Sequence, residues 1–431
     1  MAVKIKIAVA GLGGRGKDTY GALLLKMKDK AQVVAIADCD DEKLELMGEA
    51  HNVPAAMRFA SAEEMFEKPK LADAVLICTQ DRQHVPHALA ALDKGYDILL
   101  EKPISPDLDD LQKIVRQARI KNRTVVVCHV LRYTPFFTRI KQAIDSNVLG
   151  EIVAIQAREN VCYWHQAHSY VRGNWRRSGE TSPMILSKCC HDLDYLVWLC
   201  GKQCRSVSSF GSLMHFRSEC APEGAALRCL DGCKAKDACP YDAEKIYLTN
   251  KTGVLSGNTG WPCSILSQHP SEKSMREALE NGPYGRCVYH CDNDVVDHQV
   301  VNMEMEGGAT LTLTMSAFTS DGGRTIKIMG THGDLWGDIT ENILRITPFG
   351  KPAEVIDVST LSDDFTGHAG GDKLLLEQFI GLLEGKTPDS KITTLETSVE
   401  SHLIAIAAEH SRLNGGMSVA IAPMRGDRGV L

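Results

Sequence analysis

The amino-acid sequence predicts two domains: an α/β domain built on a doubly wound parallel sheet, and an α+β domain with an open, largely antiparallel sheet. A buried strand at residues 4–10 leads through a glycine-rich turn into a helix, and strands and helices then alternate. Near residue 131 this pattern gives way to alternating apolar and polar positions, as in antiparallel strands. A chain of 431 residues is also too long for one ordinary core. We therefore expect domains at residues 1–130 and 131–431.

The turn after the first strand has the spacing of a dinucleotide-binding site. Gly11, Gly13 and Gly16 form G-x-G-x-x-G, which supplies a tight turn, close backbone approach to a pyrophosphate and close helix–strand packing. The free N–H groups and the dipole at the start of the helix favour an anionic ligand, so Gly14 and Arg15 join the predicted site. A glycine-rich turn without a ligand is the alternative, but here a strand and a helix flank the motif as binding requires.

A second strand, at residues 32–37, ends at Asp38, which lies 22 residues after Gly16. An acidic side chain at this place can bond the ribose 2′-OH of NAD and repel the 2′-phosphate of NADP. The sequence therefore predicts NAD as the cofactor, in preference to NADP.

The remaining elements of the first domain bring polar residues to one edge of its sheet. Strands are expected at 73–78, 97–100 and 124–128, and helices at 41–50, from 61, from 86 and at 108–121. Ligands collect at the carboxyl ends of such strands. The residues expected there are Thr79, His84, Glu101, Lys102 and His129.

The second half is predicted from a sparser pattern. Strands are expected at 151–159, 205–216, 298–305, 309–317, 324–329 and 343–346, and helices at 183–199, 372–383 and 395–413. Residues 218–292 resist assignment because they are rich in Gly, Pro and Cys. So long an irregular insertion needs a functional or stapling reason.

Composition limits the partners. A net charge of −7, spread along the chain, offers no basic footprint for nucleic acid. No stretch of about 18 apolar residues and no signal region is found, so neither a membrane partner nor export is expected. The cytoplasm is the expected compartment, where the 15 cysteines would stay largely reduced.

Three motifs together resemble the Gfo/Idh/MocA oxidoreductases, the family of glucose-fructose oxidoreductase and inositol dehydrogenase. They are Gly11–Gly16, the segment 79–84 and Glu101-Lys102-Pro103, and His191-Asp192-Leu193-Asp194 adds an H-x-x-D spacing. The resemblance implies a Rossmann domain, a C-terminal sheet used for oligomerisation as a dimer or tetramer, and sugar or cyclitol substrates. It also implies that Lys102 lies beside the nicotinamide and the reacting hydroxyl, with a cis bond to Pro103.

The sequence departs from the family pattern in one respect. Many members carry an aspartate four residues before the histidine that matches His191, where this chain has Ser187 followed by Lys188. Similarity at 165–175 and 367–372 indicates a branch that includes relatives acting on glycosides.

The expected catalytic residues are Lys102, Lys188 and His191. A lysine at the ligand edge can take the hydroxyl proton as hydride leaves, although a salt bridge or a phosphate contact would also explain Lys102. Lys188 and His191 are three residues apart on the predicted helix, so both side chains can point to one spot. The alternatives are a lysine that extends to solvent and a buried, hydrogen-bonded histidine.

Aromatic and polar side chains indicate where a sugar could bind. Aromatic faces stack on sugar rings while polar tips bond hydroxyls, and ordinary packing or an interface is the alternative. The candidate substrate-binding residues are His129, Trp164, His165, Arg172, Trp175, Asp192, His368 and Asp372.

Four cysteines, Cys220, Cys229, Cys233 and Cys239, stand at C-x8-C-x3-C-x5-C spacing in the insertion. Four thiolates around a structural Zn²⁺ would organise so loop-rich a segment. An iron–sulfur cluster, free thiols and disulfides remain open alternatives.

The sequence thus favours an NAD-dependent oxidoreductase that takes a hydride from a ring hydroxyl of a sugar or glycoside. One alternative is a glycosidase that keeps NAD bound and acts by oxidation, elimination and re-reduction. A second is a non-catalytic sensor of sugar or NAD.

Overall fold

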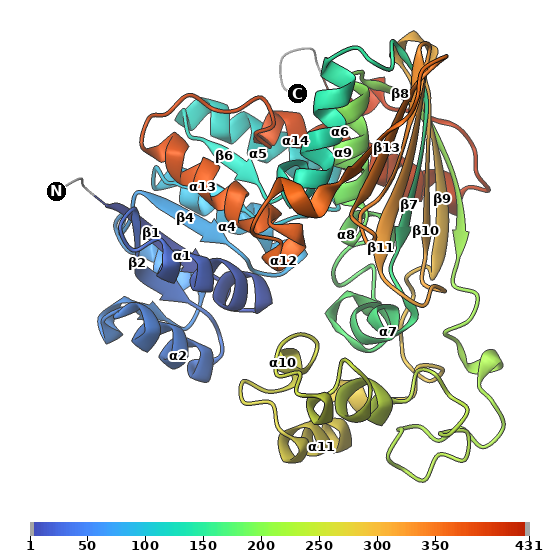
Figure 1. Ribbon diagram of the computed structural model, residues 1–431. Helices are drawn as coiled ribbons and strands as arrows, with labels where there is room; N and C mark the ends of the chain where they lie inside the picture. The colour runs from blue at the N-terminus through green and yellow to red at the C-terminus, as the bar shows by residue number, and fades with distance from the viewer. Residues whose placement is uncertain (1–3, 427–431) are drawn as a thin grey trace.

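The computed structural model describes residues 4–426 and contains the two sheets that the sequence predicts (Figure 1). The first is six-stranded and parallel, with the order β3-β2-β1-β4-β5-β6. Its strands are β1 (Ile5–Ala10), β2 (Ala31–Ala37), β3 (Arg58–Phe59), β4 (Ala74–Ile77), β5 (Asp97–Leu100) and β6 (Val125–Val127). The strand order reverses between β1 and β4, so a crevice opens beyond their carboxyl ends.

Helices of the first domain start and stop at local signals. They are α1 (Ala22–Lys26), which continues a π-helical turn at Gly14–Gly21, α2 (Asp41–His51), α3 (Ala62–Glu67), α4 (His84–Asp93) and α5 (Leu108–Lys121). The side chains of Asp40, Ser61 and Asp107 accept backbone N–H groups at the starts of α2, α3 and α5. Asn52 and Asn122 end α2 and α5 at positive φ.

The second sheet has nine strands in the order β14-β13-β12-β11-β7-β10-β9-β8-β15. Among the described strands the pairs are antiparallel, except that β7 and β10 run parallel. Its strands are β7 (Ile152–Asn160), β8 (Cys204–Ser212), β9 (His298–Met305), β10 (Thr310–Ser316), β11 (Gly323–Gly330), β12 (Gly333–Asp338), β13 (Ile343–Pro348), β14 (Glu354–Asp357) and β15 (Val419–Ala420). The predicted mixture of sheets is confirmed, while β3, β12, β14 and β15 were not expected.

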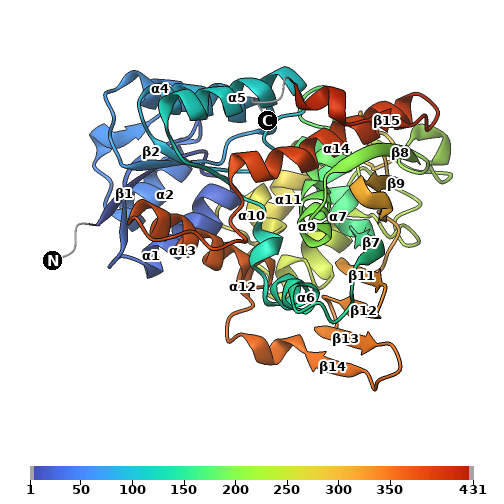
Figure 2. The same ribbon diagram turned by 90° about the horizontal axis from the view of Figure 1, so that it is seen from above.

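Two long helices near the end of the chain lie in different places (Figure 2). α13 (Gly371–Leu383) returns to the first sheet beside α1, where Leu375, Leu376 and Phe379 share a core with Ile7 and Val9. α14 (Leu395–Leu413) packs on β8 and α9 of the second domain. The first sheet is therefore completed by a helix from the far end of the chain.

The single helix expected over residues 183–199 is in fact two helices, α8 (Met184–Ser187) and α9 (Cys190–Cys200). Lys188 lies at the break, and its side chain turns to Glu159 on β7, 3.3 Å away. The remaining helices are α6 (Pro135–Asp145), α7 (Tyr163–His165), α10 (Cys263–Leu266), α11 (Glu272–Asn281) and α12 (Thr366–Ala369).

The insertion at about 218–292 forms a lobe with its own apolar core. In Figure 1 this lobe, with α10 and α11, lies below the two sheets. Buried residues of this lobe and of the segment that leads into it pack against Ala167 and Val171, among them Phe216, Tyr241, Ile246, Tyr247, Met275 and Leu279. Within residues 4–426, no helix combines the length and the apolar character needed to cross a membrane.

Candidate active site

The glycine-rich turn has the geometry of a cradle for a pyrophosphate. Gly11 has a φ of 88°, and a Cβ there would lie 2.5 Å from the Cys78 carbonyl oxygen, while a Cβ at Gly16 would collide with the Gly11 carbonyl. Packing within the protein therefore requires both glycines. A Cβ at Gly13 would meet no described atom within 4 Å. Gly13 therefore lies open, as approach of a ligand to the turn requires.

Asp38 follows β2 directly and is tied to this turn. Its Oδ2 accepts the N–H of Leu12 at 2.5 Å, and its Oδ1 accepts the N–H of Asp40 at 3.0 Å. Lys43 Nζ lies 4.0 Å from the carboxylate. The carboxylate thus stands at the crevice beside the turn, where a ribose hydroxyl would bind.

Arg15 links three elements across the crevice. Its guanidinium bonds Glu101 at 2.6 Å, Asp372 of α13 at 2.7 Å and the hydroxyl of Tyr20 at 2.6 Å. Burial opposes ionisation of Glu101, but the charges of Arg15 and Lys102 hold its pKa below the usual value. Burial likewise opposes ionisation of Asp372, whose pKa Arg15 and then the neighbouring histidine hold well below the usual range. Arg15, Glu101 and Asp372 therefore fasten the turn to β5 and α13.

Thr79 and His84 shape the loop after β5. The His84 ring nitrogens lie 2.6 Å from the Pro103 carbonyl and 3.0 Å from the Thr79 carbonyl. The Thr79 hydroxyl pairs with the ring of His87 at 3.0 Å. The Lys102–Pro103 bond is cis, as the family resemblance implies.

Lys102 and Lys188 flank Ser187 in the centre of the molecule. Lys102 Nζ donates to the Ser187 carbonyl at 2.8 Å. Lys188 instead pairs with the buried Glu159, whose other oxygen is 2.7 Å from Arg324. Burial raises the pKa of Glu159, and the charges of Arg324 and Lys188 oppose that rise. Lys188 is thus held by a carboxylate, whereas no described carboxylate is within ion-pair distance of Lys102.

Asp192 and His191 both lie in the first turn of α9, but among the described residues Asp192 is ion-paired whereas His191 is not. Asp192 is fully buried and forms a two-point ion pair with Arg324, at 2.7 and 3.1 Å. His191 lies 5.8 Å, between ring centres, from His368, and its Nδ1 has no hydrogen-bond partner among the described residues. Burial, and then the charge of Lys102, lower the pKa of His191 well below its usual value. Its imidazole is therefore neutral near pH 7, and its unpaired Nδ1 is buried from solvent.

His129 is buried in a network below this centre. Its Nδ1 lies 2.7 Å from Asp194, which also takes a two-point bond from Arg132. Its ring stacks on His402 at 5.6 Å. The His129 side chain is fully buried, so it is enclosed by these protein groups rather than open to a substrate.

The remaining candidates divide between the crevice and the insertion. Burial, and then the charges of Lys188, His168 and Lys102, lower the pKa of His165 well below its usual value. Trp164 lies beside His165, and the Trp175 indole N–H donates to Asp81 at 3.0 Å. His368 meets Asp372 at 3.0 Å.

Arg172 lies in the insertion core instead, where it is fully buried. Its guanidinium donates to the carbonyls of Arg286 and Tyr241, at 2.7 and 2.8 Å, and approaches the Cys229 thiol at 3.5 Å. These bonds hold the lobe together, so the structure does not support substrate binding by Arg172.

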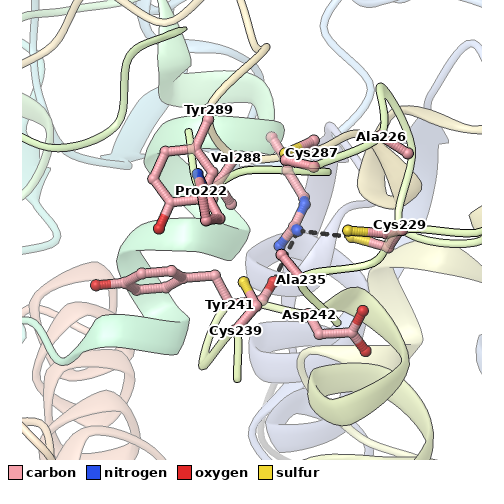
Figure 3. Close-up of a pocket in the computed structure, with 13 residues that line it drawn as sticks. Pro222, Ala226, Cys229, Ala235, Cys239, Tyr241, Asp242, Cys287, Val288 and Tyr289 are labelled. Carbon is pink, nitrogen blue, oxygen red and sulfur yellow. Dashed lines mark hydrogen bonds between the residues drawn. The ribbon is translucent and has the colours of Figure 1, made fainter. Parts of the chain in front are cut away.

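The predicted zinc site is not supported. Cys229, Cys233 and Cys239 line one small cavity, together with Cys287 and with Tyr241 and Tyr289 (Figure 3). Cys220 is absent from that lining, and its thiol points to the Met214 carbonyl at 3.5 Å. Across residues 4–426, no group of three or more metal-ligating side chains is arranged to hold an ion. The physical reason why these thiols are not arranged to hold a metal ion is Arg172, because its positively charged guanidinium occupies the space beside them.

Sequence reasoning missed Glu159 and Arg324, which hold Lys188 and Asp192. Glu159 and Arg324 stand on neighbouring strands, β7 and β11, which pair at these two positions. A charged residue at an alternating position of a strand looks like a surface residue, so the sequence carries no signal for this pair.

A doubly wound parallel sheet with this turn and this acidic residue, facing lysines across a crevice, defines the class of NAD-binding oxidoreductases. A family model described as the NAD-binding Rossmann fold of an oxidoreductase family matches residues 5–129, and the model of that family's C-terminal alpha/beta domain matches residues 141–421. The chain therefore belongs to the Gfo/Idh/MocA family and is an NAD-dependent oxidoreductase, as the sequence motifs predict.

Individual relatives are distant. The chain is 24% identical over 402 residues to the putative oxidoreductase YteT of Bacillus subtilis, covering 89% of each chain. It is 26% identical over 212 residues to a myo-inositol 2-dehydrogenase of Thermotoga maritima, covering 49% of this chain and 59% of that one.

Among solved structures, the chain is similar to the WlbA dehydrogenase of Bordetella pertussis in complex with NADH and UDP-GlcNAcA. The TM-score is 0.66 at 16% identity, covering 97% of this chain and 99% of that one. An oxidoreductase from Agrobacterium radiobacter, in complex with NAD⁺, L-tartaric acid and magnesium, gives a TM-score of 0.67 at 16% identity, covering 98% and 100%. At these identities the likeness shows the fold.

Proposed function

We propose that the protein oxidises a ring hydroxyl of a sugar or glycoside and passes the hydride to NAD. The observation that carries this proposal is Lys102 Nζ, placed at the carboxyl end of β5 with Ser187 as its hydrogen-bond partner and without a paired carboxylate among the described residues. The inositol dehydrogenase and the nucleotide-sugar-bound WlbA among the relatives support a polyol substrate.

The charges around Lys102 favour a neutral substrate. Lys188 and Arg324 contribute two positive charges, and Glu159 and Asp192 compensate them at 2.7 to 3.3 Å. Because these four groups neutralise one another, they add no net charge beside Lys102 that would select an anion. A sugar that offers hydroxyls to such groups fits this balance.

The proposed residues divide the work as follows. When bound, NAD accepts the hydride that leaves the carbinol carbon. Lys102 Nζ takes the hydroxyl proton as the O–H bond breaks, so that the carbinol becomes a ketone. The Ser187 carbonyl positions Lys102, and Asp38 and the glycine turn hold the ribose and the pyrophosphate.

A second candidate function rests on His191. Elimination of a leaving group next to a ketone requires a base for the acidified C–H, and the neutral imidazole of His191 can serve. In such a reaction the leaving group would depart as its alcohol, water would add in its place, and the hydride would return to the sugar, so a glycoside would be cleaved without net formation of NADH. Lys188, held by Glu159, then stabilises developing negative charge.

The test is a screen of free sugars and aryl glycosides with NAD, following both NADH absorbance and aglycone release. The dehydrogenase predicts net NADH with each turnover. The glycosidase predicts aglycone release, no net NADH, and solvent deuterium beside the oxidised carbon. Binding of NAD without turnover of any sugar would contradict both and indicate a sensor. An oligomer of two or four chains and a cytoplasmic location stay predictions.

A further inference from the structure

One exposed tryptophan of the insertion stands apart from the lobe's own core. Trp261 is 43% exposed, although it precedes Pro262 and Cys263, which are buried. Its indole contacts three rings of the second domain: Trp164 at 4.9 Å, His165 at 4.8 Å and His168 at 5.4 Å between centres. The ring is therefore supported on one side and open on another.

The loop that carries Trp261 is held firmly. The Asn258 amide donates to the carbonyls of Thr252 and Trp261, at 2.7 and 3.2 Å, and its oxygen accepts the N–H of Gly260 at 3.0 Å. Just beyond, the fully buried Cys263 thiol points to the carbonyl of Thr252, at 3.3 Å. A side chain mounted this way is preorganised, which lowers the entropy cost of binding.

The same segment reaches the NAD-binding domain. Ile265 on α10 lies over the glycine-rich turn, since a Cβ at Gly14 would be 3.8 Å from its Cδ1. His269 Nε2 lies 3.4 Å from Glu42 of α2. In Figure 1 α10 lies between the first sheet's helices and α7. Trp261 thus stands where the insertion closes one side of the crevice.

The position of Trp261 relative to the catalytic centre defines what it can contact. His165 ends α7, which directly follows β7, and Glu159 of β7 holds Lys188 at 3.3 Å. The indole of Trp261 lies against the ring of His165, 4.8 Å away between ring centres. A single sugar held at Lys102 would fill the place next to that lysine. The indole of Trp261 would then meet whatever is attached to that sugar.

We propose that Trp261 is a specificity-determining residue that stacks on the second ring of a glycoside, while the first ring is oxidised at Lys102. This inference rests on the proposed function and narrows its substrate class to two-ring compounds, such as disaccharides or aryl glycosides. The C–H face of a pyranose, or an aryl ring, packs on an indole face.

The experiment compares matched pairs of probes with NAD: D-glucose with cellobiose and phenyl β-D-glucoside, and D-galactose with lactose and phenyl β-D-galactoside. We expect the unmodified protein to prefer a glycoside to its parent sugar. Trp261→Ala should lower kcat/KM for that glycoside about tenfold, or about 1.4 kcal/mol, and change the parent sugar less than about twofold. Trp261→Phe should fall between. Trp336→Ala, which removes a similarly exposed indole from β12, should leave both unchanged.

Equal loss on sugar and glycoside, or no loss, would overturn the inference and leave the proposed oxidation standing. If no probe is oxidised, the proposed function fails, and calorimetry of the NAD-loaded protein then decides the inference alone. Tenfold weaker glycoside binding by Trp261→Ala would support stacking. Unchanged binding, or none, would overturn it.

Discussion

Removing the charge of Asp38 is the sharpest test of how the protein selects its cofactor. A 2′-phosphate bound at the end of β2 would face this carboxylate, which is 10% exposed. Two unit charges 4 Å apart interact by about 4 kcal/mol at an effective dielectric constant of about 20, and by about 1 kcal/mol in water. Lys43, 4.0 Å from the carboxylate, offsets part of the repulsion. We therefore expect Asp38 to disfavour NADP by about 2–3 kcal/mol, or about 30- to 150-fold.

The choice of substitution matters because Asp38 also accepts the Leu12 N–H, at 2.5 Å. Asp38→Ala removes the charge but also leaves that donor unpaired, at a cost of about 1–3 kcal/mol, so a loss of affinity for both cofactors would be added to the change in their ratio. Asp38→Asn keeps an acceptor oxygen and removes the charge. It should therefore shift the ratio of the two dissociation constants by the full 30- to 150-fold while the turn stays ordered.

Isothermal titration calorimetry with NAD and NADP measures both constants directly. Asp40→Asn, a neighbouring acidic residue that caps α2, serves as the charge-matched control and should leave the ratio near its original value. Tighter binding of NADP than of NAD by the unmodified protein would refute the reasoning. An unchanged ratio in Asp38→Asn would refute it as well.

Three further substitutions test other parts of the site. Lys102→Ala should lower kcat by about 10²–10⁴ with NAD affinity retained, and loss of NAD binding instead would make Lys102 a cofactor ligand. Asp372→Asn should lower the melting temperature most at pH 7 and progressively less as the pH falls below about 4. A carboxyl with a depressed pKa contributes its full stability above its unfolded pKa of about 4, and this contribution is lost completely only below its folded-state pKa. A pH-independent difference would contradict that. Arg172→Met should leave two carbonyls without their hydrogen-bond donor, at a cost of about 1–3 kcal/mol each, and should speed thiol labelling of the insertion. Unchanged labelling would show that Arg172 does not hold the insertion together.

The sequence predicted the elements whose limits are local. Helix α5 and strand β5 match the expected bounds because Asp107 caps the helix and β5 is a buried apolar run. The prediction of one helix over residues 183–199 was wrong. The apolar pattern continues through Lys188, but α8 ends there, where the Lys188 side chain pairs with Glu159 on a distant strand. Local patterns report nothing of such tertiary contacts.

The cysteines failed as predictors for a related reason. Spacing cannot reveal that a cation from another segment, Arg172, lies beside Cys229, or that Cys287 replaces Cys220 in the lining. The cofactor turn was predictable because each glycine there answers a steric demand of the backbone itself. A feature could therefore be predicted when its cause lies within the same short segment, and could not when its cause lies in a distant segment.

The helix α13 has a consequence for how the protein is made. The strands of the nucleotide-binding sheet are complete at residue 127, but the apolar face that Leu375 and Phe379 cover waits for residues 371–383. At a synthesis rate of about 5–20 residues per second, that apolar face stays exposed to solvent for tens of seconds. During this time the nascent sheet is exposed to aggregation and to chaperones. The nucleotide-binding sheet therefore reaches its final packing only after residues 371–383 have been made.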